Sequence, residues 1–263
     1  MGLIRNAYGK SKKNLTGQVM KSIYIAIQDA VSHRWTPVAR VDREEESYRL
    51  RYTKGARSVD GFRGFVRMEQ LEREFTSYEL FPILKNRVLS RSRPEFSAYA
   101  HWLGSGQREL DVFDELARTG GLRGTDSLEL IPLPEKTDDG KYQVYFFVHG
   151  IRHVAPEVKS LLSKIKEGDR LYVAADLQNN YDQYALFLRT VDPIALVGYV
   201  PRYYSRDFFS LLRCDPKAVE VEVEQVNSSA PAPFRLLCKM AAPWPNGFNA
   251  CSGEFYELIS PAH

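Results

Sequence analysis

The residues best suited to chemistry in this sequence lie in three short segments of its second half. Their guanidinium, imidazole, phenol, amide and carboxylate groups together can hold the end of a nucleic-acid strand without cutting it. Guanidinium groups bind phosphates, rings stack on bases, and a carboxylate accepts a hydrogen bond from a hydroxyl. The candidate nucleic-acid-binding residues are Arg152, His153, Asn179, Tyr181, Asp182, Tyr199 and Arg202.

Each segment lies at the end of a predicted strand or between two strands. Asn and Asp tolerate left-handed backbone and cap their own turns, so residues 179–182 are expected to form a turn. Arg152 follows Gly150, a residue type that lets another chain approach the backbone closely, and Arg202 follows a later strand. Two ordinary alternatives stay open: the turn is a plain strand connection, and each arginine is an exposed surface charge.

The sequence shows no arrangement that indicates catalysis, and we expect no catalytic residue, no bound metal and no cofactor. Asp139, Glu157 and Lys159 match a nuclease pattern only superficially, because the last two follow Pro156 at a predicted helix start. Acidic and amide residues around Asp182 alternate as in a calcium-binding loop. The glycine at the sixth position and the glutamate at the twelfth position of such a loop are missing here, so calcium binding is not expected. The histidines have no metal-ligand spacing. A non-enzymatic protein is therefore expected, and a metal-dependent nuclease is the least favoured alternative.

Charge and cysteine content disfavour several classes of protein. The 263 residues carry a net charge of +3; residues 1–138 contain 23 basic and 19 acidic residues, and the rest contain 13 and 14. The second half is not broadly basic, so nucleic-acid binding there must depend on a local cluster. Three cysteines without paired spacing indicate neither a disulfide framework nor a zinc site. Because no apolar run reaches membrane-spanning length, we expect a cytoplasmic protein with no membrane partner.

The pattern along the chain predicts an arm, two domains and a linker. Residues 1–21 are basic with little apolar periodicity, which is typical of a flexible arm. Residues 22–132 are expected to form an α+β domain, and residues 133–141 a linker with a turn signal. Residues 142–263 are expected to form a β-rich domain with a C-terminal extension.

Local periodicity predicts the elements of both domains. The first should contain strands at 23–28, 36–42 and 48–52 and helices around 80–88, 96–103 and 112–117, the last ending at Gly120-Gly121. The second should contain strands at 142–149, 170–175, 185–190, 195–200, 218–226 and 234–240 and helices at 157–166 and 205–213. The expected fold class is α+β, with a small antiparallel sheet and helices followed by a six-stranded, barrel-like unit with two helices.

Three segments of the second domain together resemble a HIRAN domain. They are Phe147-Val148-His149-Gly150-Ile151-Arg152-His153, Gln178-Asn179-Asn180-Tyr181-Asp182 and Val197-Gly198-Tyr199-Val200-Pro201-Arg202. The resemblance covers about residues 142–242 and implies an open barrel that recognises the 3′ end of a single strand. It implies that Tyr181 and Asp182 contact the terminal nucleotide and that Arg152 contacts phosphates, as Arg202 on the neighbouring rim can also do.

The resemblance gives Asp182 a selective role. A carboxylate accepts a hydrogen bond from a free 3′-hydroxyl, whereas inside a strand a phosphate takes the place of that hydroxyl. Two unit charges about 4 Å apart repel by roughly 4 kcal/mol at an effective dielectric of about 20, so Asp182 should reject interior positions. The chain departs from the family at His153-Val154, where an aromatic pair is common, and at Asn180, where proline is usual. Base stacking should therefore be weaker or partly transferred to Tyr199.

The order of elements in residues 33–132 is similar to the N-terminal subdomain of HipA-type toxin kinases. A sheet precedes Leu80-Phe81-Pro82 and Lys85-Asn86-Arg87, and Gly120-Gly121 precedes Asp126-Ser127-Leu128. No P-loop or kinase catalytic loop follows, which implies docking of a protein partner rather than phosphoryl transfer.

A basic run lies in the same region and consists of Lys85, Arg87, Arg91 and Arg93. It could bind an acidic partner or extend a nucleic-acid track, while a solvated helix face is the more ordinary account. The leading hypothesis is a protein whose second domain binds the 3′ end of single-stranded DNA, with RNA left open, and whose first domain docks a partner. The alternative is a protein-interaction or regulatory module of a toxin or defence system without nucleic-acid binding.

Overall fold

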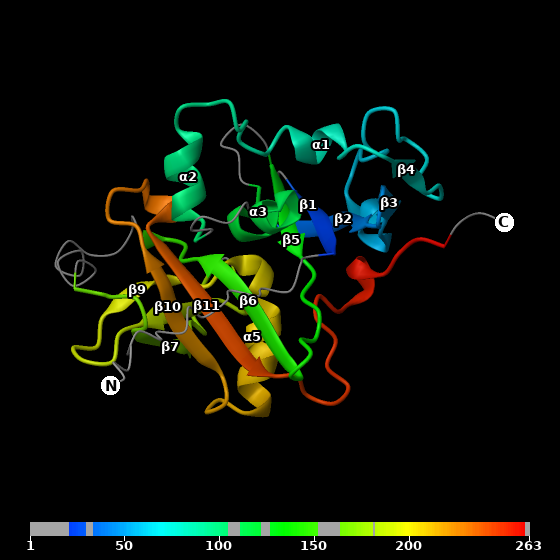
Figure 1. Ribbon diagram of the computed structural model, residues 1–263. Helices are drawn as coiled ribbons and strands as arrows, with labels where there is room; N and C mark the ends of the chain where they lie inside the picture. Colours follow the sequence, from blue (N-terminus) through cyan, green and yellow to red (C-terminus); the bar gives the residue numbers. More distant parts are fainter. Residues whose placement is uncertain are drawn as a thin grey trace, which may run out of the picture.

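The computed structural model describes residues 21–29, 34–104, 111–121, 127–151, 164–180 and 182–260. Two antiparallel sheets organise them (Figure 1). The first sheet has the strand order β4-β3-β2-β1-β5. Its strands are β1 (Ser22–Gln28), β2 (Trp35–Arg43), β3 (Tyr48–Tyr52), β4 (Phe75–Ser77) and β5 (Leu128–Pro132), with the short helix η1 (Lys54–Ser58) after β3.

Three helices lie between β4 and β5 along the chain: α1 (Pro82–Lys85), α2 (Phe96–Trp102) and α3 (Val112–Thr119). Asp111 caps α3 by accepting a hydrogen bond from the Phe113 backbone at 2.9 Å. The helix ends at Gly120, whose φ of 64° is the left-handed conformation expected for the glycine pair. Phe113 and Leu116 of α3 are fully buried in the core of this sheet.

The second sheet has the strand order β6-β11-β10-β7-β8-β9. Its strands are β6 (Lys141–Phe147), β7 (Arg170–Ala175), β8 (Leu186–Arg189), β9 (Leu196–Tyr199), β10 (Glu220–Val226) and β11 (Leu236–Pro243). The helix α5 (Arg202–Cys214) follows β9, and two short helices, η3 (Ala232–Phe234) and η4 (Glu254–Tyr256), lie in the connections.

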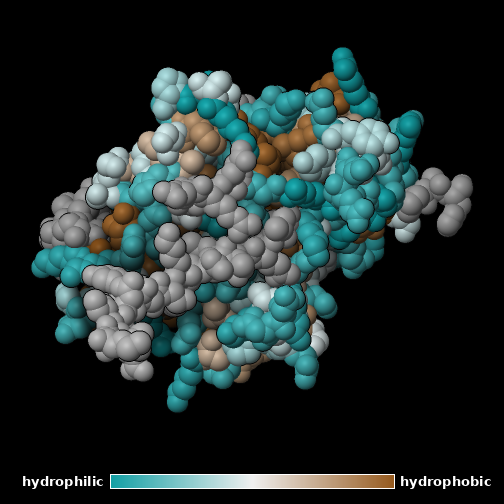
Figure 2. Space-filling view, viewed as in Figure 1, coloured by the Kyte–Doolittle hydropathy of each residue, from teal (hydrophilic) through white to brown (hydrophobic). Residues whose placement is uncertain are grey.

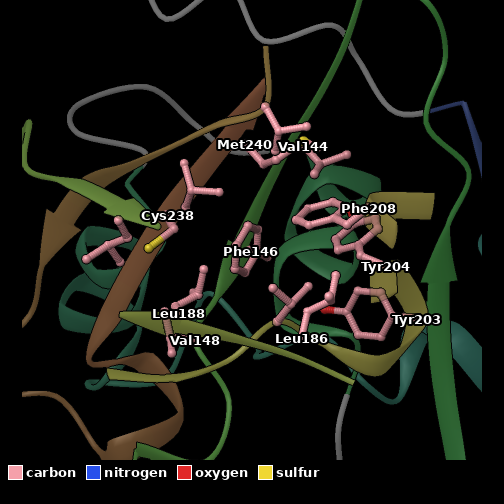
Figure 3. Close-up of a cluster of buried hydrophobic side chains, with 14 of the residues drawn as sticks. Val144, Phe146, Val148, Leu186, Leu188, Tyr203, Tyr204, Phe208, Cys238 and Met240 are labelled. Atoms are coloured by element: carbon pink, nitrogen blue, oxygen red, sulfur yellow. The ribbon is translucent and has the colours of Figure 1, made fainter. Parts of the chain in front are cut away.

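The core of the second sheet lies between its strands and α5. Figure 3 shows Phe146 of β6 facing Tyr204 and Phe208 of α5, and the Phe146 and Phe208 rings meet edge to face at 5.7 Å. This core also includes Tyr24 and Ile131 of the first sheet, so apolar side chains from both sheets share it.

The chain after β11 returns to the first sheet, as the red segment in Figure 1 shows. Ile259 donates a backbone hydrogen bond to Tyr52 at 2.9 Å, and Lys54 forms an ion pair with Glu257 at 2.6 Å. The ring of Tyr256 meets Tyr24 edge to face at 5.0 Å. The last described residues therefore hold the two sheets together.

The expected α+β fold class is confirmed, with an antiparallel sheet and helices followed by a six-stranded half-barrel. Two strands of the first sheet, β4 and β5, were not predicted. The division into residues 22–132, 133–141 and 142–263 stays a prediction, as does the arm, of which only residue 21 is described. Within the described residues, no helix combines the length and the apolar character needed to span a membrane.

The expected helix at residues 80–88 is wrong in length. Pro82 begins α1 at a position where a missing N–H costs nothing, and the helix ends after one turn. Beyond it, Arg87 and Val88 donate to the carbonyls three residues earlier, as turns do, at 2.9 and 3.3 Å. Apolar residues recur at helical spacing in this segment because the turn and the loop after it both pack against the core of the first sheet. The helix expected at 157–166 lies largely outside the described residues.

Candidate nucleic-acid interface

The two edges of the second sheet meet at a bridge between His149 and Tyr199. His149 donates to the Tyr199 carbonyl at 2.9 Å, and Tyr199 donates to the His149 carbonyl at 2.8 Å. Gly198 permits this approach, because a Cβ at that position would lie 2.5 Å from the His149 oxygen. The segment after β6 is thereby fixed beside β9, and the half-barrel closes at this point.

The connection between β7 and β8 is a turn held by its own side chains. Asn179 donates through Nδ2 to the Asp176 carboxylate at 2.9 Å and accepts from the Asp182 backbone at 3.0 Å. Asp182 in turn accepts from the Tyr184 backbone at 2.9 Å. Asn and Asp were expected to cap such a turn, and they do. The turn therefore presents Asp182 in a fixed, half-buried position.

Tyr199 joins the turn to the closing bridge. Its hydroxyl donates to the Asp176 carboxylate at 3.1 Å. Partial burial and, after it, this bond to Asp176 raise the pKa of Tyr199. The Tyr199 ring also lies beside Gly150, where a Cβ would be 3.3 Å from ring atom Cδ2. Tyr199 thus lies between the turn and the segment that follows β6.

Arg202 is exposed on the first turn of α5, three residues after Tyr199. Its positive charge acts on two buried or half-buried neighbours. Burial, with a smaller contribution from Arg202, lowers the pKa of His149 to about 4. Burial raises the pKa of Glu129 in β5 to about 7, and Arg202 opposes that rise. His149 is therefore neutral at pH 7, and Arg202 is a cation among the described residues at this edge that can meet a phosphate.

The structure links Asn179, Asp182 and Tyr199 through hydrogen bonds that involve Asp176, and Arg202 begins α5 three residues after Tyr199. The other three predicted site residues, Arg152, His153 and Tyr181, lie outside the described residues. Their roles stay predictions.

Sequence analysis considered Asp176 only as the first position of a calcium-like loop and did not assign it to the site, although the arrangement depends on it. It accepts hydrogen bonds from Asn179 and from Tyr199, the latter 23 residues away. Its local signal was an acidic residue directly after a strand and three before Asn179, which is the spacing of a side-chain-capped turn. The contact with Tyr199 is long-range and leaves no local pattern.

An apolar side chain also lies on this turn. Leu177, next to Asp176, is 78% exposed. Single exposed apolar residues are common on protein surfaces, so the exposure of Leu177 assigns it no role by itself.

The described residues contain no group of three or more His, Cys, Asp or Glu side chains that could hold a metal ion. The carboxylates of Asp176 and Asp182 are used by the turn itself. The chemistry of the donors here is hydrogen bonding and charge pairing, and the expectation of no metal and no cofactor stays a prediction.

Comparison with known proteins gives one family and two structures. The HIRAN domain model matches residues 141–241. A protein from Lactobacillus plantarum of known crystal structure is 20% identical, with 39% of this chain and 97% of that chain covered and a TM-score of 0.31. The HIRAN domain of human HLTF is 16% identical, with 40% and 81% covered and a TM-score of 0.28.

No curated protein matches the chain. The family match spans all six strands of the second sheet up to residue 241 and includes the turn and the closing bridge. The resemblance of the first domain to the HipA-type subdomain stays a prediction. The chain therefore contains a HIRAN domain, at residues 141–241.

Proposed function

We propose that the HIRAN domain of this protein binds the 3′ end of single-stranded DNA and that the chain performs no catalysis. The observation that carries the proposal is the hydrogen-bonded series from Tyr199 through Asp176 to Asn179 and Asp182. A binding site needs its polar groups fixed before the ligand arrives, because ordering them on binding costs affinity.

Asp182 is the group suited to the terminal sugar. Its Oδ1 atom accepts from the Tyr184 backbone, and within the described part of the chain its Oδ2 atom has no hydrogen-bond partner. That oxygen can accept a hydrogen bond from a 3′-hydroxyl. A 3′-phosphate in the same place brings a second negative charge against the carboxylate, which disfavours both chain interiors and phosphorylated ends.

Arg202 and Tyr199 supply the other two interactions that a strand end needs. The exposed guanidinium of Arg202 can bind a phosphate, with two parallel hydrogen bonds where the geometry allows. The half-buried ring of Tyr199 offers a face, and stacking on a base is worth about 1–3 kcal/mol. The predicted contributions of Arg152, His153 and Tyr181 add to this set.

Fluorescence titration with end-modified oligonucleotides tests the proposal. Wild-type protein should bind a 3′-hydroxyl strand at least tenfold more tightly than the same strand with a 3′-phosphate, while changes at the 5′ end should have no effect. Asp182→Asn keeps the shape and the backbone hydrogen bond but removes the charge, so it should lose most of this discrimination. Equal affinity of the wild type for both ends would remove the proposal. A matched RNA strand in the same titration decides between DNA and RNA.

We also infer that the first domain docks a protein partner. Two large side chains there, Val66 and Tyr78, are 84% and 83% exposed, and tyrosine is enriched among the residues that contribute most to protein–protein binding. Purification of the wild type beside a Val66→Ser, Tyr78→Ser variant tests it. A protein that accompanies only the wild type in stoichiometric amount supports docking, and identical profiles speak against it. Such a partner without any oligonucleotide binding favours the alternative of an interaction module.

A further inference from the structure

A cleft of about 1080 Å³ lies between the helical part of the first domain and the second sheet. One wall is formed by residues 85–90, Arg93, Tyr99 of α2, and Arg118, Thr119 and Gly121 in and after α3. The opposite wall is formed by residues 147–151, which follow β6, and by 232–234, which form η3. In Figure 2, hydrophobic residues gather on the upper part of a mostly hydrophilic face, around α1, close to where residues 85–90 follow it.

The described residues that line this cleft include basic but no acidic side chains. The basic ones are Lys85, Arg87, Arg93 and Arg118. All four come from residues 22–132, which contain 17 basic and 17 acidic residues, so the positive charge is local to the cleft and is not a property of the whole domain. The HIRAN domain thus gains at this boundary a positive field that its own sequence does not provide.

The four cations differ in how firmly they are held. Arg87 donates to the Gly121 carbonyl at 2.5 Å, and Arg118 donates to the Leu103 carbonyl while its guanidinium lies 4.8 Å from the Tyr145 ring. These two are fixed parts of the wall. Lys85 and Arg93 are exposed, and the Lys85 pair with Glu79 at 3.0 Å is a surface ion pair of little energy. The side chains of Lys85 and Arg93 are therefore weakly held and can move to bind phosphates.

Aromatic rings line the same cleft. Phe234 of η3 meets Tyr99 at 5.7 Å and Phe147 at 5.3 Å, both edge to face. Phe147 is 3% exposed and supports the other two rings, while Tyr99 and Phe234 are half-buried and can offer a face to a base. The hydroxyl of Tyr99 donates to Glu115, which is buried behind it and does not line the cleft. Basic side chains interleaved with aromatic rings are the usual surface for a single strand, because phosphates meet the cations and bases meet the rings.

The cleft reaches the neighbourhood of the HIRAN site at Gly150. Gly150 lines the cleft, and the ring of Tyr199 lies directly against its backbone. Gly150 has a φ of 73°, so a side chain there is disfavoured and the passage stays free of one. A strand whose last nucleotide lies at Asp182 and Tyr199 can pass over Gly150 into the cleft.

We propose that the single strand held at its 3′ end by the HIRAN domain continues into this cleft, where Lys85 and Arg93 of the first domain bind the phosphates of its upstream nucleotides. The inference rests on the function proposed above and assigns it a second, sequence-independent contact region. The two domains then bind one ligand, and the basic run at residues 85–93 is a nucleic-acid track.

Two oligonucleotides of different length test strand binding in the cleft independently of 3′-end binding by the HIRAN domain. Both carry the same 3′-hydroxyl terminus, one with three nucleotides and one with ten. The wild type should bind the longer strand more tightly and with a steeper dependence on salt. A Lys85→Ala, Arg93→Ala variant should lose roughly tenfold in affinity for the longer strand and reduce its slope of log K against log salt by about 1.4, because each phosphate contact contributes about 0.7. Its affinity for the three-nucleotide strand should be unchanged.

Arg63→Ala is the matched control, because Arg63 is an exposed arginine of the same domain that does not line the cleft. It should bind both strands as the wild type does. The cleft proposal is overturned if the double variant binds the longer strand with wild-type affinity and slope while Asp182→Asn still loses end discrimination. If the wild type binds neither strand, the proposed function and the cleft proposal fail together.

Discussion

The hydroxyl of Tyr199 donates a hydrogen bond of 3.1 Å to the carboxylate of Asp176 and so ties β9 to the turn before β8. The same carboxylate holds Asn179. One acidic side chain therefore sets the distance between the ring that can stack on a base and the turn that can meet the terminal sugar. The spacing of the proposed site depends on Asp176 rather than on any residue that touches the ligand.

Removing the Tyr199 hydroxyl should loosen this tie without unfolding the domain. Tyr199→Phe keeps the ring, and we expect a loss of about 0.5–1.5 kcal/mol in unfolding free energy, the usual net value of one such hydrogen bond. Urea denaturation measures it. Tyr172→Phe is the control, because Tyr172 is 39% exposed and its hydroxyl has no hydrogen bond within the described residues. If both variants behave alike, the bond to Asp176 does not hold the turn.

Closing the half-barrel requires glycine at position 198. In Gly198→Ala the new Cβ would lie 2.5 Å from both the His149 oxygen and Val148 Cγ1, so the bridge must open. We expect a loss of more than about 2 kcal/mol in unfolding free energy. Gly247→Ala separates this clash from backbone strain, because Gly247 also has a positive φ, of 75°, but a Cβ there would have nothing within 4 Å. Comparable losses in the two variants would contradict the close approach.

Arg202 should be distinguishable from the arginine at the other end of α5. Arg202→Ala should weaken 3′-end binding about fivefold or more, whereas Arg213→Ala, roughly 16 Å away along the helix, should not. Loss of the nearby cation should also raise the pKa of His149 from about 4 and that of Glu129 from about 7. Titration followed by NMR checks both shifts. Unchanged pKa values would place Arg202 away from this edge.

Asp207 should make the stability of the protein depend on pH. It is buried on α5, accepts from the Tyr142 hydroxyl at 3.3 Å and the Cys251 backbone at 3.1 Å, and burial raises its pKa from 3.8 to about 7. Between these values the folded state holds a proton that the unfolded state releases. The contribution of protonated Asp207 to the free energy of unfolding is therefore complete below about pH 4 and is lost as pH rises through about 7.

The neutral variant Asp207→Asn removes this dependence. Relative to the wild type, it should gain stability as pH rises from 4 to 7, by an amount on the order of a few kcal/mol, and the difference should then level off. Urea denaturation of both proteins at pH 5 and pH 8 measures the change. A difference that is the same at both values would show that Asp207 has an ordinary pKa in the fold.

Asn227 should tie the first domain to the second. It is 4% exposed and donates through Nδ2 to the Trp102 carbonyl at 2.9 Å and to the Phe234 carbonyl at 2.8 Å. Asn227→Ala leaves these partly buried acceptors without their donor, which should cost about 1–3 kcal/mol in unfolding free energy. Asn246→Ala, an exposed asparagine, should cost almost nothing. Urea denaturation measures both losses. Similar unfolding midpoints for the two variants would show that the contact of Asn227 with α2 does not stabilise the protein.

Much of the fold could be predicted because its strands carry strong local patterns. The bounds of β3 and β7 agree with the expectation, and β1 and β2 differ by only one residue at each changed end. The short strand β4 has no fully buried residue and left no pattern. The wholly buried β5 lacks the alternation that marks a half-exposed strand.

Sequence analysis could predict only the part of the candidate site that is formed by residues close together in the sequence. Asn179 and Asp182 were found because their turn is made by neighbours in sequence. The role of Asp176 and the neighbourhood of Arg202 and Glu129 depend on contacts across strands and between sheets. Spacing along the chain carries no information on such contacts, which is also why the basic run at 85–93 could not be assigned to a cleft wall.

The returning C-terminal segment sets a limit on how the protein can be divided. Cys251 is buried in the core of the HIRAN sheet, and Trp244, Phe248 and Tyr256 pack against that core, as do Tyr24 and Ile131 from the other side. All of them fall beyond the 141–241 family match. A fragment cut at those borders would expose a large part of its own interior to water. In this chain the segment that matches the family is smaller than the unit that shares one hydrophobic core, which also includes residues before and after it.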